Sequence, residues 1–92
     1  MLTQTAHKEQ LREALLRIMA AAPSVAYPPA ELARRVRGSS AVDAPFDERD
    51  VSDALALLQG VGLAKPQKRP LSGLQDWRIT SEGVQFFEAN YA

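Results

Sequence analysis

Residues 46–63 read FDERDVSDALALLQGVGL, and this stretch carries the clearest signals for the start and end of a helix. Asp47 is a good helix N-cap, and Asp50 stands three residues later, where its side chain can complete a capping box. Phe46 can pack against the first apolar turn as a hydrophobic staple. Apolar residues then recur every three or four positions until a glycine, which predicts an amphipathic helix over about 47–59.

Two further helices are predicted on the N-terminal side of this stretch. Between about residues 5 and 21 one helical stripe is formed by Leu11, Ala14, Leu15, Ile18 and Met19. Pro23 prevents the helix from continuing. Pro28-Pro29 marks the next start, because a proline in the first turn loses no helical hydrogen bond. Gly38 is a natural stop, so this helix should cover about 29–37.

After Gly62 the apolar residues alternate instead of following a helical period, which predicts two short strands around a loop rich in proline and glycine. Trp77 and Ile79 flank a polar residue, so one face of the second strand should be buried. We expect this hairpin over about 63–79. A further short strand near 24–27 could pair with it.

A last helix is predicted over about 81–91, with Thr80 or Ser81 as its N-cap. Its core face is assigned to Val84, Phe87 and Tyr91. Adjacent residues on a helix diverge by about 100°, so Phe86 cannot face the same core as its neighbour. Phe86 and Leu2 are therefore candidates for a homodimer contact between the terminal helices, although ordinary exposure of one aromatic explains Phe86 equally well.

The chain has 92 residues, a usual size for one domain, so a single domain over 1–92 is expected. Apolar residues make up 46% and charged residues 24%, as in ordinary globular proteins and unlike disordered chains. The absence of cysteine excludes disulfides and thiolate metal sites. The order helix, helix, helix, strand, strand, helix predicts a mainly α fold with a small β-hairpin, of the α+β class.

Three short motifs occur in a characteristic order along the chain. They are Glu31-Leu32-Ala33, then Leu58-Gln59-Gly60-Val61-Gly62-Leu63, then Trp77-Arg78-Ile79-Thr80-Ser81-Glu82-Gly83. Together they resemble the winged helix-turn-helix superfamily, and the resemblance covers nearly the whole chain. The chain departs from the family in one place. Residues 38–46 join the second and third predicted helices, whereas in a helix-turn-helix the corresponding turn usually has about three or four residues.

The resemblance implies a DNA-binding domain of the bacterial transcriptional-regulator type, in which the third helix enters the major groove and the hairpin, or wing, touches phosphates. By position, the groove-facing residues of the third helix would be Glu48, Arg49, Ser52, Ala56 and Gln59. The wing contacts would be Lys65, Gln67, Lys68 and Arg69. Phosphate contacts could also come from Arg34, Arg35 and Arg37, although the helix dipole alone favours cations at a helix C-terminus.

The charge distribution leaves two functions open. The net charge is zero, which disfavours strong non-specific binding to nucleic acid. Residues 65–78 carry a net charge of +3, whereas residues 41–64, which include the third helix, carry −4. The first function is therefore weak, dimer-dependent binding to duplex DNA. The second is a protein-interaction module that uses Glu48, Asp50, Asp53 and Phe86.

No residue pattern indicates an enzyme, a metal site or a cofactor. His7 is the single histidine, no base is placed to activate a nucleophile, and the glycines match no phosphate-binding fingerprint. The start of the chain lacks the basic flank and apolar run of a secretion signal, and no apolar run approaches the roughly 18 residues of a membrane span. We expect a cytoplasmic protein that binds no membrane.

Overall fold

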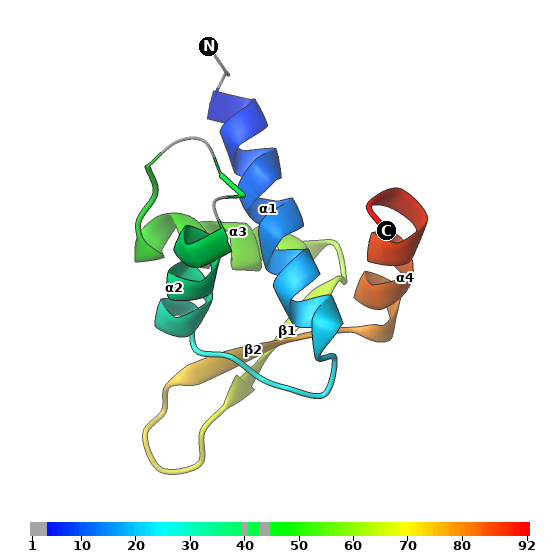
Figure 1. Ribbon diagram of the computed structural model, residues 1–92. Coiled ribbons are helices and arrows are strands. Elements are labelled where there is room, and N and C mark those ends of the chain that lie inside the picture. The colour runs from blue at the N-terminus through cyan, green and yellow to red at the C-terminus, as the bar shows by residue number, and fades with distance from the viewer. Residues whose placement is uncertain (1–3, 40, 43–44) are drawn as a thin grey trace.

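The computed structural model describes residues 4–39, 41–42 and 45–92, and its elements follow the predicted order (Figure 1). The elements are α1 (Gln4–Ala21), α2 (Pro29–Ser39), α3 (Glu48–Gly60), β1 (Ala64–Lys68), β2 (Gln75–Ile79) and α4 (Ser81–Asn90). The two strands form one antiparallel hairpin. This confirms the mainly helical class with a small hairpin, and the arrangement is that of a winged helix.

The core lies where α1, α2 and α3 pack on one another and on the inner face of the hairpin (Figure 1). The largest fully buried side chains are Leu15, Leu16, Met19, Leu32, Leu55, Val36 and Val51. Burying one such side chain stabilises the fold by about 1.5–3 kcal/mol. Leu16 lies outside the predicted stripe of α1, and Ile18 inside that stripe is only partly buried. The buried face of α1 is wide because α4 packs on it as well as α2 and α3.

Strand register decides which side chains of the hairpin enter the core. Ala64 stands opposite Ile79, and Pro66 stands opposite Trp77. Ala64, Trp77 and Ile79 are buried, as the alternation predicts. Paired residues share a face, so the intervening residues lie on the outer face of the hairpin.

Tyr27 connects the hairpin to the start of α2. Its N–H donates to the Trp77 carbonyl at 2.9 Å, and the Trp77 N–H donates to the Tyr27 carbonyl at 2.7 Å. The strand expected near 24–27 is therefore a single β-bridge. The backbone N–H and carbonyl of Trp77 both bond to Tyr27, so its partner Pro66, which has no N–H, leaves no ladder hydrogen bond unmade. For this reason β1 can run through a proline.

The predicted N-caps of α3 and α4 are confirmed. The Asp50 N–H donates to Asp47 Oδ1 at 2.9 Å, and the Asp47 N–H donates to Asp50 Oδ2 at 3.0 Å, which completes the capping box. Of the two alternatives for α4, Thr80 is the cap, with its Oγ1 accepting from the Gly83 N–H at 3.0 Å. The same hydroxyl donates to the Gly62 carbonyl at 2.7 Å.

Other helix ends differ from the prediction by a residue or two. Gly38 does not stop α2, which ends at Ser39, where the hydroxyl donates to the Val36 carbonyl. The third helix ends at Gly60, and Gly62 makes the turn with φ +82. The core assignment of Tyr91 is wrong, since Tyr91 is the C-cap of α4 and is exposed, whereas Val84 and Phe87 are partly buried against the core.

Gly83 gives a direct test of how closely α4 approaches the hairpin. A Cβ at this position would collide with the Leu63 carbonyl oxygen and with the Ile79 side chain. We expect Gly83→Ala to lower the free energy of unfolding by about 1–3 kcal/mol in denaturant titrations. Gly38→Ala is the control, because no atom lies within 4 Å of a Cβ there. Equal losses in both variants would contradict this packing.

Candidate nucleic-acid interface

The outer face of α3 carries the residues that the resemblance assigns to the major groove. Val51, Ala54, Leu55 and Leu58 are buried, which turns the opposite face to solvent. All five predicted groove residues are exposed: Glu48, Arg49, Ser52, Ala56 and Gln59. Four of them recur at helical spacing along one stripe, Arg49, Ser52, Ala56 and Gln59. We call these four residues the outer stripe of α3.

The acidic residues of α3 have structural surroundings that the sequence alone could not place. Asp47 and Asp50 form the capping box. Asp50 and Asp53 also line a pocket whose other wall contains Lys8 and Arg12 of α1. Two of the acids assigned to the protein-interaction alternative therefore lie on the flank of α3 that faces α1.

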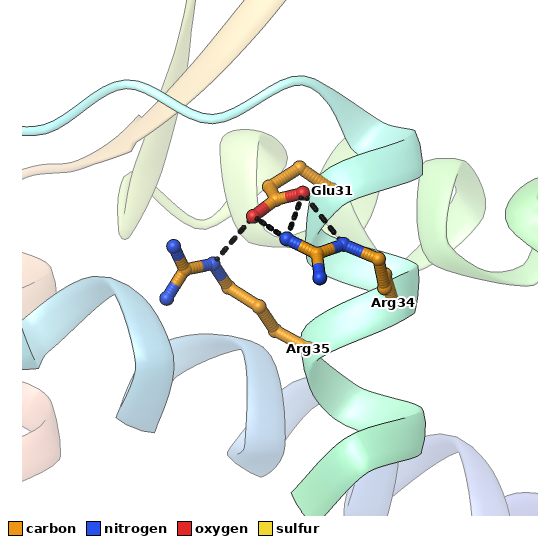
Figure 2. A network of polar contacts seen from close by, with 3 residues as sticks. All are labelled: Glu31, Arg34 and Arg35. Atoms are coloured by element: carbon orange, nitrogen blue, oxygen red, sulfur yellow. Dashed lines mark hydrogen bonds and ion pairs between the residues drawn. The ribbon is translucent and has the colours of Figure 1, made fainter.

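Two of the predicted phosphate-binding arginines of α2 are paired within the helix. Figure 2 shows the Glu31 carboxylate between two guanidinium groups. Arg34 donates to it from Nε at 2.9 Å, and Arg35 donates from its own Nε at 3.0 Å. The Arg34 hydrogen bond, followed by that of Arg35, holds the pKa of Glu31 below its ordinary value. Glu31 thus neutralises part of the positive charge expected on this helix.

The other contacts of these arginines hold the fold together. The Arg35 guanidinium lies 5.0 Å from the centroid of the Tyr27 ring, on the segment that bridges to the hairpin. Arg37 lies 5.1 Å from the Phe46 ring centroid and donates from Nη2 to the Phe46 carbonyl at 3.3 Å. Arg37 therefore anchors the end of the long connection between α2 and α3.

The wing contains one paired cation and three unpaired ones. Arg69 donates from Nη2 to Asp76 Oδ1 at 2.8 Å, and this hydrogen bond raises the pKa of Arg69 above its ordinary value. Within residues 4–39, 41–42 and 45–92, no acidic side chain forms an ion pair with Lys65, Lys68 or Arg78. We call Lys65, Lys68 and Arg78 the wing cations.

Arg78 is a candidate contact that local sequence patterns do not single out. It was counted in the charge of the wing but was not chosen as a contact. The register places it directly opposite Lys65 on the outer face, and Gln67 opposite Asp76. Like charges directly opposite one another destabilise a hairpin, so this pair has no evident role in folding. Only the pairing register, which local patterns did not give, could have revealed it.

Of the two residues expected at a dimer contact, the structure describes Phe86. Phe86 is 39% exposed, and its ring meets that of Tyr91 edge-on at 6.0 Å between centroids. The prediction that Phe86 stays outside the core is confirmed. Leu2 lies outside the described residues.

The described residues form neither of two other kinds of site. Of the helices described, none has the length and apolar character needed to cross a membrane. Likewise, the described part of the chain contains no cluster of three or more His, Cys, Asp or Glu residues that could hold a metal ion.

No protein-family model and no curated protein sequence matches this chain. Solved structures do. A transcriptional regulator from Clostridium thermocellum, Cth-833, superposes with a TM-score of 0.76 at 16% identity, over 97% of this chain and 84% of that one. ZitR from Lactococcus lactis, as its C30AH42A mutant in apo form, gives 0.68 at 19% identity, over 92% of this chain and 57% of that one. At such low identities these superpositions establish a shared fold alone. The chain has the winged-helix fold of these proteins.

The role of the α3 acids in capping can be tested by substitution. Asp47→Ala removes the side-chain acceptor for the Asp50 N–H, so we expect it to lower the free energy of unfolding by about 0.5–2 kcal/mol. Asp47→Asn keeps an acceptor without the charge and should keep most of the stability. If Asn is as damaging as Ala in thermal unfolding, the charge and not the cap is what Asp47 provides.

Proposed function

We propose that this chain is a DNA-binding module of the transcriptional-regulator type, with the outer stripe of α3 in the major groove and the wing on the phosphate backbone. The outer stripe offers a guanidinium, a hydroxyl and an amide, from Arg49, Ser52 and Gln59. These groups suit hydrogen bonding to base edges and phosphates. The shared fold with Cth-833, a transcriptional regulator, supports the same proposal.

The observation that carries the proposal is the set of wing cations. Asp76, the one acidic residue of the hairpin, forms an ion pair with Arg69. No other acidic side chain of the hairpin remains to neutralise the wing cations. Lys65 and Arg78 stand opposite each other although this juxtaposition opposes folding. An external polyanion would relieve that repulsion, and the phosphate backbone of DNA is the polyanion that the resemblance to winged helix-turn-helix proteins suggests for the wing.

The expected affinity of a single copy is modest. Each phosphate contact contributes about 0.9 to the slope of log K against log salt, so three wing contacts give only about 2.7. Half-site recognition by a two-fold dimer doubles the number of contacts. We propose that binding depends on a homodimer formed through the terminal helices α1 and α4, with Phe86 and Tyr91 at the contact.

The alternative, protein recognition through Glu48, Asp50, Asp53 and Phe86, has less support. Asp50 accepts a hydrogen bond in the capping box, and Asp50 and Asp53 line the pocket against α1. These four residues therefore do not form one continuous acidic surface on α3. Binding of a protein partner that is lost in Asp53→Lys would nevertheless favour the alternative over DNA.

A salt titration tests the role of the wing. We expect Lys68→Gln/Arg78→Gln to lower the slope of log K against log salt by about 1.8 for each bound protomer, and so by about 3.6 for the dimer, on a mixed-sequence duplex, measured by fluorescence anisotropy. Lys8→Gln/Arg17→Gln removes the same charge from α1 and should keep the wild-type slope. Absence of salt-dependent binding by the wild type, or equal losses in the two variants, would refute DNA binding through the wing.

A second measurement tests the dimer. Phe86→Ser should shift the chain from dimer to monomer in sedimentation equilibrium and weaken DNA binding, because it removes the most exposed aromatic of α4. Gln85→Ser changes an exposed neighbour and should leave both properties unchanged. A wild-type chain that is monomeric both alone and on DNA would overturn dimer dependence while leaving the wing contacts intact.

A further inference from the structure

A pocket of about 470 Å³ opens between α1, the start of α3 and residues 42, 45 and 46. Its volume lies within the range of about 300–1,000 Å³ that is typical of small-molecule sites. Much of its wall is apolar, formed by Leu11, Val42, Phe46 and Ala54. The wing cations lie outside this pocket, and so do Glu31 and its partners Arg34 and Arg35. The proposed DNA contacts therefore do not account for the pocket.

Arg12 supplies the unusual feature of the wall. Its Nε is buried and has no hydrogen-bond partner, and Arg12 takes part in no ion pair within the described part of the chain. Leaving a buried N–H of a charged group without an acceptor is costly. Arg17, further along the same helix, shows the usual arrangement, since it pairs with Glu13 at 3.2 Å. Arg12 therefore lines the pocket with a positive charge that no acidic group of the described residues balances.

The charges around the pocket limit the kind of acceptor that fits. Lys8 and Arg12 line it from α1, and Asp50 and Asp53 line it from α3. No ion pair of the described residues joins the two walls. These four charges cancel. A polyanion would be repelled by the two carboxylates, whereas a single negative charge can lie at the α1 wall and leave an uncharged body near α3.

We propose that this pocket binds a small organic molecule with one carboxylate and an apolar body of about the size of a phenyl ring. The two terminal nitrogens of the Arg12 guanidinium can hold a carboxylate through parallel N–H donors, and Lys8 adds positive charge to the same wall. Leu11, Phe46 and Ala54 pack against the apolar body. The inference stands without the proposed DNA binding, because it rests on the pocket and on Arg12 alone.

The proposal is tested on the full chain with three probes: 3-phenylpropanoate, its uncharged analogue 3-phenylpropan-1-ol, and inorganic phosphate. Binding is followed by the amide shifts of α1 and α3 in NMR titrations. The carboxylate should produce saturable shifts at Leu11 and Ala54, and the alcohol should bind at least about tenfold more weakly, since a hydrogen bond to a charged group is lost. Phosphate should leave these amides unchanged.

Variants assign the preference to Arg12. Arg12→Met keeps the apolar stem and removes the unsatisfied donor, so it should fold with a melting temperature at or above that of the wild type while binding the carboxylate and the alcohol equally. Arg17→Met is the matched control and should bind like the wild type. Arg12→Lys keeps the charge without the planar fork, and we expect an intermediate affinity from it, so the proposal stays testable if Arg12→Met does not fold.

Three results would overturn the proposal. The first is no saturable shift with 3-phenylpropanoate. The second is an equal affinity of the wild type for the carboxylate and the alcohol. The third is a carboxylate preference that survives in both Arg12 variants, which would place the anion elsewhere.

Discussion

The pair of backbone hydrogen bonds between Tyr27 and Trp77 is the constraint on which the rest of the structure depends. It joins the segment before α2 to the second strand of the wing, so the helices and the hairpin are held in one arrangement. It also explains why Pro66 is tolerated in β1 and why Trp77 is buried beside Tyr27. Arg35 covers the Tyr27 ring from α2 and protects this junction.

A neutral chain with an acidic third helix can still present a basic surface, because most of its acidic groups are engaged away from the wing, where cations are left unpaired. Asp47 and Asp50 cap α3, Asp50 and Asp53 line the pocket against α1, and Glu31 pairs with two arginines of α2. The wing keeps positive charge because its only acid pairs with Arg69. The net charge of zero is thus a poor guide to the local field that a partner would meet.

The features of the fold that depend on short-range sequence signals could be predicted. Capping residues, proline starts and alternating apolar residues specified the element order and most bounds, because each acts within a few residues. The Glu31 pairing with Arg34 and Arg35 also follows helical spacing, although only the helix dipole and phosphate contacts were considered for these arginines. The Lys65–Arg78 opposition and the Arg12 pocket could not be predicted, because they depend on strand register and on the packing of α1 against α3.

The most direct test of the central claim is an NMR titration of the chain with a short mixed-sequence DNA duplex. The account predicts amide shifts along β1 and β2 and on the outer stripe of α3, with the α1-facing flank that holds Asp50 and Asp53 unchanged. Shifts confined to that flank, or no shifts at low salt, would contradict the account.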